Sequence, residues 1–322
     1  MEDKLKTLGE AASLIASGSS ISIGGFTSQR HPTALLRKLI KDGVRDLIIY
    51  CHSAGSDVDL LIGAGSVKRV EGAYQADGVF TPISPNWRRF VEAGRIHFED
   101  YSNASMMARF AAGAMGLPFM PVKSMLGSDL MERWGFSSEE RKVDPEAAPA
   151  KVHKMECPFT GQQLALVPAI KTDFCLLHVQ KASPQGLLRI EGQEFLDVQQ
   201  AMASRCVIAT CEEVVKDEEL RRNPELNRIP HFAVDAVVHL PFGAHPHSVH
   251  NAYDYDPEHL MEFSRASKDD ASFDRYLERY VFGPDSHEEY LELIGGEARM
   301  RALRARSGLG YNPELARRGG DR

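Results

Sequence analysis

The sequence predicts an α/β fold with an open, mainly parallel sheet, helices on both faces of the sheet and a helical C-terminal segment. Apolar runs of strand length alternate with segments whose apolar residues recur at helical spacing, and the links between them are short. Such alternation is typical of a parallel sheet covered by helices. Residues 46–51 form an almost continuous apolar run, as a strand buried on both faces requires. Residues 257–305 carry mostly helical patterns.

The first elements have clear boundaries. Residues 5–16 carry apolar side chains at helical spacing, and Ser17-Gly18 ends this helix because glycine suits a helix C-terminus. Residues 21–23 alternate apolar and polar side chains in a short strand, which Gly24-Gly25 breaks. A helix over residues 32–40 then begins with proline, which is favourable at the first helical position.

Strand and helix patterns continue to alternate along the chain, except in the polar stretch 124–157, which we expect to be an insertion or long loop. We expect one domain over residues 1–322, with 256–322 as a mostly helical C-terminal extension. The further predicted helices are 57–62, 86–93, 104–115 and 195–203. The further predicted strands are 67–74, 96–98, 163–168, 173–179, 187–190, 207–210 and 233–240.

The charge of the chain argues against a nucleic-acid partner. The net charge is -7, whereas nucleic-acid binders usually present a basic field. The C-terminus is locally basic and includes Arg317, Arg318 and Arg322, but acidic residues interrupt it. We therefore predict a solvated helix face followed by a tail.

Cysteine usage and hydropathy predict a cytoplasmic protein without a membrane segment. The five cysteines are odd in number, and no pair has C-x-x-C spacing, so we expect reduced thiols. The N-terminus is charged and is not followed by an apolar signal region. No run approaches the roughly 18 apolar residues of a transmembrane helix.

The glycine turn after the first strand is a candidate binding loop. Gly24 and Gly25 lie between a strand and a helix, where glycine allows close approach of a ligand and free N–H groups favour an anion or a developing oxyanion. The alternative is an ordinary turn. The chain shows no G-x-G-x-x-G after a strand and no G-K-[ST], so it lacks the nucleotide-binding motifs.

A second candidate loop, S-A-G-S-D (residues 53–57), follows the strand that ends at Cys51. Ligands of open α/β sheets bind beyond the carboxyl ends of strands, so this loop and the glycine turn are expected to line one crevice. The alternative is a capped helix start, with Ser56 or Asp57 as the N-cap. Cys51 and His52 cannot form a nucleophilic pair, because adjacent strand residues point to opposite faces.

Two further patterns contain residue types that could carry chemistry. His245, His247 and His250 have a spacing that could supply metal ligands, but they lie in a Pro-containing loop without a helical i, i+4 pair or a cysteine, so we predict no metal. Glu71 and Glu191 each precede a glycine at a strand end or turn. Either could attack a thioester, but both also fit plain turns, and nothing in the sequence orients them.

With these loops in place, the chain resembles the glutaconate type of A subunit within the family I coenzyme A transferases, along nearly its whole length. The shared runs are I-G-G-F-T-S-Q-R-H-P (23–32), D-V-D-L-L-I-G (57–63), F-V-E-A-G (90–94), F-E-D-Y-S (98–102), G-L-P-F-M-P-V (116–122), A-S-P-Q-G (182–186), T-C-E-E (210–213), V-D-A-V-V (234–238), G-A-H-P (243–246), Y-D-Y-D (253–256) and G-L-G-Y (308–311).

The resemblance implies one part of a heteromeric enzyme that moves CoA between an acyl-CoA and a free carboxylic acid, such as a glutaconate-like dicarboxylate. The nucleophilic glutamate is then expected on the B subunit of the CoA-transferase, so this chain has no catalytic residue of its own, and coenzyme A is a substrate rather than a cofactor. The expected oxyanion and acyl-CoA loop is Gly24, Gly25, Phe26 and Thr27, with N–H groups near Gly25 and Phe26 as donors. The expected pocket residues are Ser53, Ala54, Gly55, Gly78, Asn103, Leu126, Gly127 and Ser128.

This chain departs from the family pattern at the expected pocket. Gly78 and Leu126 stand where the glutaconate type has a serine and a glutamine, so the pocket is expected to be less polar and to hold a second carboxylate less well. A related branch, the ring-opening hydrolases of CoA esters, relies on a glutamate near the position of Asn103, which cannot act as a general base. Transfer of CoA is therefore the leading hypothesis, and hydrolysis of a CoA ester is the alternative. A non-catalytic CoA-binding or regulatory protein is a further alternative.

Overall fold

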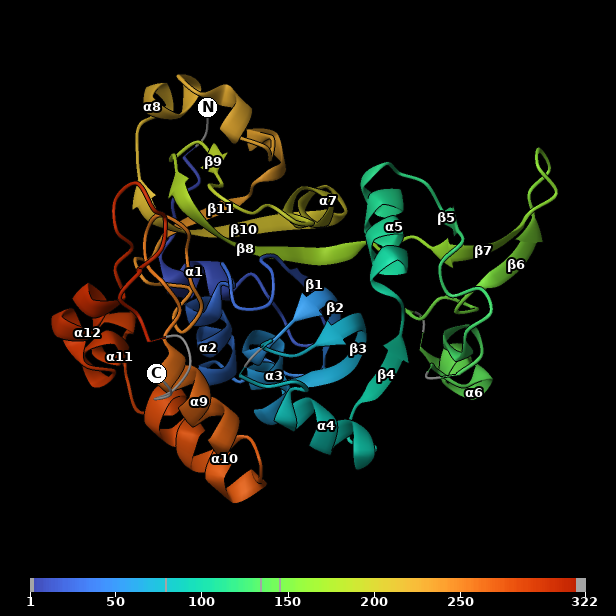
Figure 1. The fold of residues 1–322 in the computed structure, drawn as a ribbon, viewed down its shortest axis with the longest axis horizontal. Coiled ribbons are helices and arrows are strands. Elements are labelled where there is room, and N and C mark those ends of the chain that lie inside the picture. The colour runs from blue at the N-terminus through green and yellow to red at the C-terminus, as the bar shows by residue number, and fades with distance from the viewer. Residues whose placement is uncertain (1–2, 79, 134, 145, 317–322) are drawn as a thin grey trace.

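The computed structural model describes residues 3–78, 80–133, 135–144 and 146–316. Its centre is an eight-stranded sheet in the order β11-β10-β8-β1-β2-β3-β4, with β9 paired to β8 (Figure 1). All neighbours along this path are parallel, and β9 alone is antiparallel. The mainly parallel sheet is therefore confirmed. Its strands are β1 (Ser20–Ile23), β2 (Leu47–Ala54), β3 (Val67–Gln75), β4 (His97–Asp100), β8 (Thr172–Ala182), β9 (Leu188–Arg189), β10 (Ser204–Val214) and β11 (Ala236–His239).

Helices cover both faces of the sheet, as the alternation of side chains along β2 demonstrates. Ile49 and Cys51 belong to one apolar cluster, whereas Ile48 and Tyr50 belong to another on the opposite face. The first cluster includes residues of α1 (Leu8–Ala12), α2 (Thr33–Lys41), α3 (Ser56–Gly63) and α4 (Pro85–Glu92). The second includes residues of α5 (Asn103–Ala114) and the residues flanking α7 (Asp197–Met202).

A second, antiparallel sheet projects from the body in the order β5-β7-β6 (Figure 1). Residues 163–168 are a strand, as expected, but they belong to this sheet and not to the central one. The stretch 124–157 is not a plain loop, since it contains a 3-10 turn, a helix and a strand whose residues are largely exposed and so carry no apolar pattern. The elements are β5 (Phe119–Val122), η1 (Asp129–Met131), α6 (Ser138–Val143), β6 (His153–Glu156) and β7 (Gln163–Pro168).

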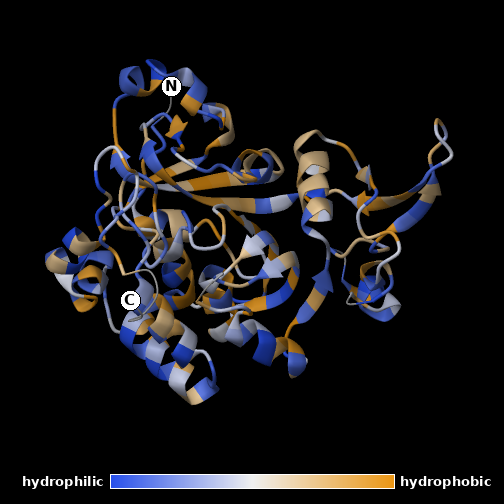
Figure 2. Ribbon diagram, in the orientation of Figure 1, coloured by the Kyte–Doolittle hydropathy of each residue, from blue (hydrophilic) through white to orange (hydrophobic). Residues whose placement is uncertain are grey.

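The C-terminal segment is helical, as predicted. Apolar colour concentrates in the strands of the central sheet, and polar colour marks much of the outer helices (Figure 2). The predicted tail residues Arg317, Arg318 and Arg322 lie outside the described part of the chain. The remaining elements are α8 (Asp217–Arg221), η2 (Pro224–Leu226), η3 (His231–Ala233), α9 (Pro257–Ala266), α10 (Asp270–Leu277), η4 (Glu278–Phe282), α11 (His287–Leu293) and α12 (Gly296–Leu303).

The first helix is shorter than the expected 5–16. Thr7 is its N-cap and forms a capping box with Glu10, so the helix cannot begin earlier. Leu5 instead pairs with Val237 at the edge of the central sheet. Over the described residues, the helices all fall short of the length and apolar character needed to cross a membrane.

Candidate functional site

Three loops converge at the carboxyl edge of the central sheet. Gly24 follows β1 and Gly55 follows β2, and a Cβ atom on Gly55 would lie 3.1 Å from the carbonyl oxygen of Thr27. The same Cβ atom would lie 1.8 Å from Oδ1 of Asp77, which follows β3. Glycine at position 55 is therefore required for this close approach. Gly55 is also the N-cap of α3, so the prediction of Ser56 or Asp57 as the N-cap was wrong.

The Gly24-Gly25 turn is shaped by packing as well as by backbone conformation. A Cβ atom on Gly24 would lie 2.4 Å from the side chain of Leu177. Gly25 has φ +94°, and a Cβ atom there would lie 2.3 Å from the carbonyl oxygen of Gln29. Both glycines are therefore structurally necessary for the turn.

The expected oxyanion donors are already bonded within the chain. The N–H of Gly25 donates to Oδ1 of Asp197 (3.1 Å), and the N–H of Phe26 donates to the carbonyl of Gln29 (3.0 Å). Gln29 donates back to Phe26, which makes a tight hairpin with Thr27 and Ser28 at its tip. Neither expected N–H group is free in this conformation. The N–H groups of Thr27 and Ser28 have no hydrogen-bond partner in the described part of the chain.

A buried ion pair holds the base of this loop. Arg30 is 2% exposed, and its guanidinium donates to both carboxylate oxygens of Asp197, at 3.0 and 2.8 Å. Burial alone would raise the pKa of Asp197, but the guanidinium outweighs burial, and the net pKa is lowered. Because Asp197 also accepts from Gly25, this bidentate pair fixes the glycine turn to α7.

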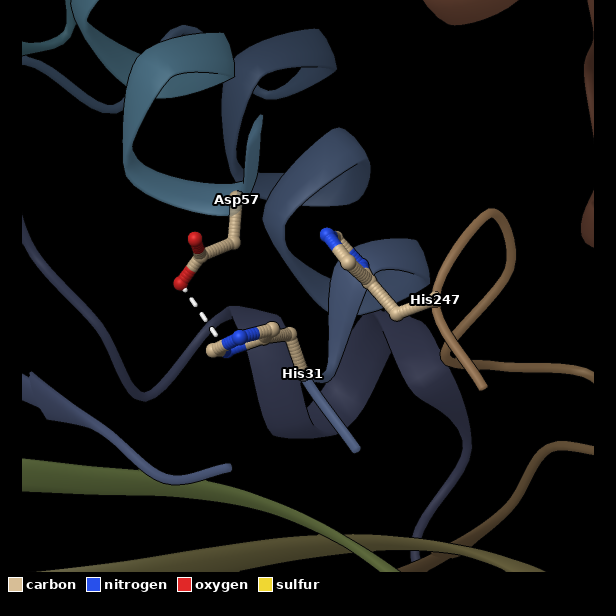
Figure 3. A group of neighbouring side chains, drawn as sticks. All are labelled: His31, Asp57 and His247. Atoms are coloured by element: carbon tan, nitrogen blue, oxygen red, sulfur yellow. Dashed lines mark ion pairs between the residues drawn. The ribbon is translucent and has the colours of Figure 1, made fainter. Parts of the chain in front are cut away.

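A second buried pair, His31 and Asp57, contacts the same loop (Figure 3). Nδ1 of His31 lies 3.0 Å from Oδ2 of Asp57, and Nε2 of His31 lies 2.8 Å from the carbonyl oxygen of Thr27. The contact with Asp57 is an ion pair whose angle falls short of a hydrogen bond, and neither atom has a hydrogen-bond partner elsewhere in the described residues. Both ring nitrogens face acceptors, an arrangement that favours the protonated imidazolium.

The pKa values of this pair follow from their environment. Burial lowers the pKa of His31, but the Asp57 carboxylate outweighs burial, so the net pKa is raised. Burial raises the pKa of Asp57, but His31 outweighs it and holds the pKa at about 2. Each group therefore favours the charged form of the other.

His247 completes a group that has the composition of a metal site. One ligand atom from each of His31, Asp57 and His247 lies within 4.8 Å of the others (Figure 3). However, Nδ1 of His247 lies 2.9 Å from Oγ1 of Thr33, and Nε2 lies 2.9 Å from Oγ of Ser56. Burial lowers the pKa of His247 to about 3, so its ring is neutral and bonded to two hydroxyls. The hydrogen bonds of His247 therefore hold the loop in place.

The other histidines of the H-P-H-S-V-H motif do not join this group. His245 lies between Asp256, at 3.1 Å, and the hydroxyl of Tyr290, at 2.8 Å. His250 is exposed. The spacing in the sequence therefore did not bring the three rings together, because the loop directs each one to a different neighbour.

An aromatic wall extends from the loop across β2. The rings of Phe26 and Phe195 lie 4.7 Å apart, and those of Phe195 and His52 lie 4.6 Å apart. His52 is 5% exposed, neither of its nitrogens has a hydrogen-bond partner in the described residues, and burial lowers its pKa to about 4. Cys51 points the other way and accepts from Gln75 at 2.8 Å, as strand alternation predicts.

The remaining expected pocket residues are less closely joined to the loops. Ser53 and Ala54 are buried at the end of β2, and Gly78 is exposed next to Asp77. Leu126, like Phe195, packs against the second apolar cluster, on the face of the sheet covered by α5. Asn103, at the start of α5, and Gly127 and Ser128 are exposed, and within the described part of the chain no hydrogen bond joins these three to the glycine turn.

The two candidate glutamates are held in internal contacts. Oε2 of Glu71 accepts from Arg109 at 2.6 Å in the interior. Oε2 of Glu191 accepts from Asn251 at 2.6 Å, and its backbone N–H and carbonyl bond to Gln180. Both carboxylates are therefore engaged by other side chains of this chain.

A parallel sheet whose glycine loops converge at one carboxyl edge is the arrangement of an α/β ligand-binding enzyme fold. The family model described as "Coenzyme A transferase" matches residues 5–240. The chain therefore belongs to the coenzyme A transferase family.

Three relatives place the chain within this family. It is 40% identical to the A subunit of glutaconate CoA-transferase of Acidaminococcus fermentans over 98% of both chains. The crystal structure of that species' glutaconate CoA-transferase superposes with a TM-score of 0.93 over 96% of this chain and 98% of the other. The A subunit of 3-oxoadipate CoA-transferase of Pseudomonas knackmussii is 30% identical over 89% of this chain and 96% of the relative. The cholesterol ring-cleaving hydrolase IpdA subunit of Rhodococcus jostii is 28% identical over 89% and 94%. The chain is thus a CoA-transferase subunit of the A type.

Proposed function

We propose that this chain is the A subunit of a two-subunit enzyme that transfers CoA from an acyl-CoA to a free carboxylic acid. The carboxyl edge of the sheet carries preformed loops and an aromatic wall, whereas the candidate carboxylates of Glu71 and Glu191 are engaged in internal ion pairs and hydrogen bonds. This observation carries the proposal. Full-length similarity to relatives named as transferase A subunits supports it.

The nucleophile in this proposal is a glutamate of the B subunit. Its carboxylate oxygen attacks the thioester carbon, and the CoA thiolate leaves to give an acyl anhydride. The thiolate then attacks the glutamyl carbonyl and releases the original acid, which leaves a glutamyl-CoA thioester on the B subunit. An acceptor carboxylate reverses these steps and takes the CoA. Coenzyme A is the substrate, and no further cofactor is needed.

This chain would contribute one wall of the site and polarise the thioester. The free N–H groups of Thr27 and Ser28, at the hairpin tip, replace those of Gly25 and Phe26 as candidate donors to a developing oxyanion. The neutral ring of His52 offers one further N–H beside Phe195. The aromatic wall would pack against the acyl chain.

The acid is proposed to be a short dicarboxylic or related acid. The relatives are named for glutaconate and for 3-oxoadipate, which are dicarboxylates. Gly78 and Leu126 offer no polar side chain, so a second carboxylate would need partners from the B subunit or from solvent. The five cysteines are free thiols, which supports a cytoplasmic location.

Borohydride trapping tests the proposal. The purified subunits are mixed with an acyl-CoA and then with sodium borohydride, which reduces the glutamyl-CoA thioester to an alcohol. Mass spectrometry of both chains should find one modified glutamate on the B subunit, none on this chain, and none when acyl-CoA is left out. A modified residue on this chain, or no modification with an acyl-CoA that supports turnover, would refute the proposal.

A further inference from the structure

The outer edge of the projecting sheet is open. β6 pairs with β7 along one side, and within the described residues no strand pairs with its other side. All of its residues, His153–Glu156, are exposed. Figure 1 shows this edge far from the central sheet. An unpaired edge of this kind is a template for another strand.

The hydrogen bonds to β7 determine which residues of β6 present free backbone groups. The N–H of Cys157 donates to the carbonyl of Gln162 at 2.8 Å, and the register pairs Met155 with Leu164. In an antiparallel ladder, bonded and non-bonded residues alternate. His153 and Met155 therefore bond to β7, and the N–H and C=O groups of Lys154 and Glu156 point outward.

Those outward groups fit a second copy of the same strand in one register. A two-fold axis at Met155 sets Lys154 opposite Glu156 of the second copy, and the symmetry repeats the pair. Centring the axis on Lys154 or on Glu156 instead sets like charges opposite each other, which is unfavourable. If the two-fold axis lies between two residues, each residue whose backbone groups point outward faces a residue whose groups point toward β7. The ladder then cannot form.

We propose that β6 pairs antiparallel with β6 of a second copy of this chain, which joins the two projecting sheets into one. Lys154 and Glu156 of the second copy exchange reciprocal N–H···O=C bonds, and their side chains form cross-strand ion pairs. Met155, 38% exposed, meets its symmetry mate. Pro158 occupies the next outward position and has no N–H, so the ladder stays short. Phe159, 94% exposed at the hairpin tip, gains cover from the second copy.

The closest existing contact of Lys154 does not prevent this pairing. Its Nζ lies 3.4 Å from Glu132, and these side chains are 60% and 77% exposed. Such an exposed pair contributes about 0–1 kcal/mol. The Lys154 side chain is therefore free to exchange partners.

A charge swap tests the proposal on the full-length chain co-purified with its B subunit. Light scattering over a range of concentrations gives the dissociation constant for copies of this chain. Lys154→Glu and Glu156→Lys should each weaken the association about tenfold, because each creates like-charge pairs on both sides of the axis. The double variant restores opposite charges and should return the constant to within about twofold of wild type.

Two further variants complete the test. Lys154→Pro removes an outward N–H but leaves the bonds to β7 intact, so it should also weaken the association. Lys142→Glu on α6, 74% exposed, makes the same charge change away from the edge and should have no effect. The proposal is overturned if the double variant fails to recover, if wild type never exceeds one copy of this chain, or if the single variants weaken only the binding of the B subunit. Circular dichroism excludes unfolding as the cause.

Discussion

At the scale of single residues, the loop 24–31 is held in an unfavourable backbone conformation by buried charges. Gly25, Thr27 and Arg30 have φ of +94°, +50° and +55°. Left-handed conformations cost roughly 1–3 kcal/mol for residues other than glycine. The Arg30–Asp197 and His31–Asp57 pairs, at neighbouring positions of the loop, offset that cost. The loop is therefore preformed, which is the condition for efficient electrostatic stabilisation of a transition state.

Gly25→Ala should strongly reduce the activity of the two-subunit enzyme, because it distorts the hairpin. Its new Cβ atom would lie 2.3 Å from the carbonyl of Gln29, and φ is left-handed, so the hairpin must shift. We expect kcat/KM to fall at least about 100-fold, since misplacement by about 1 Å costs that much. Steady-state assays of the two-subunit enzyme measure this. Gly9→Ala, in α1 with nothing within 4 Å of its new Cβ, is the matched control and should keep full activity.

His31→Gln should show a stability cost that depends on pH. The folded pKa of His31 is raised, so its contribution is fully present below the unfolded pKa of about 6.5 and is lost as pH rises through the folded value. Asp57 contributes above about 3.8, and its part is lost as pH falls through about 2. At pH 6 the variant should lose about 3 kcal/mol of unfolding free energy.

Denaturant titrations of wild type and His31→Gln at several pH values measure this difference. The gap should shrink as pH rises above about 6.5. Burial raises the pKa of Asp77 to about 7 and His31 lowers it, so both proteins are compared in an Asp77→Asn background to remove this second titration. A gap that stays constant from pH 6 to pH 9 would mean that His31 is neutral in the folded protein.

At the scale of elements, buried charge also joins α5 to β3. Arg109 on α5 donates to Glu71 on β3 at 2.6 Å and to the carbonyl of Pro168 at 2.9 Å, and Arg69 lies 3.5 Å from the same glutamate. The ring of Tyr101 lies 4.0 Å from the guanidinium of Arg109. This network fixes the helix that begins with Asn103 on its face of the sheet.

Glu71→Gln should therefore reduce stability without removing the chemistry. Two buried guanidinium groups lose their shared carboxylate, which costs about 3–5 kcal/mol. Thermal unfolding should show a clearly lower midpoint, while borohydride trapping on the B subunit persists in the protein that remains folded. Glu92→Gln on α4, in an exposed pair with Arg88, is the control and should change the midpoint little. Loss of trapping at full stability would instead make Glu71 a catalytic residue.

The sequence predicted the central sheet well because its strands are buried runs, and burial leaves a pattern. It failed for β6, whose four residues are all exposed and follow no apolar period. It found the glycine loops, because a glycine after a strand is a local signal. It did not find the partners Arg30 and Asp197, which are 167 residues apart, because an ion pair between distant segments leaves no trace in local spacing.

At the scale of the whole molecule, the chain presents different surfaces to different partners. The carboxyl edge of the central sheet is proposed to meet the B subunit, and the β6 edge is proposed to meet a second copy. Figure 1 places these regions on separate parts of the molecule. Because they do not overlap, two pairs of subunits could assemble without blocking either site, and loss of one contact should leave the other measurable.

The choice between transfer and hydrolysis is also a property of the whole enzyme, and acceptor dependence decides it. With acyl-CoA alone, a transferase should release acid up to about one equivalent per catalytic glutamate of the B subunit and then stop, because the CoA stays bound to that glutamate. Free CoA should remain near the uncatalysed rate, and adding a carboxylic acid should restore turnover. Asn103, which we expect at the position of the hydrolases' glutamate, has an amide side chain that cannot activate water. Thiol detection of CoA and chromatography of the acids follow both products. Continuous release of free CoA without any acceptor would show that the B subunit or solvent supplies the missing base, and the enzyme would then be a hydrolase built on the transferase fold.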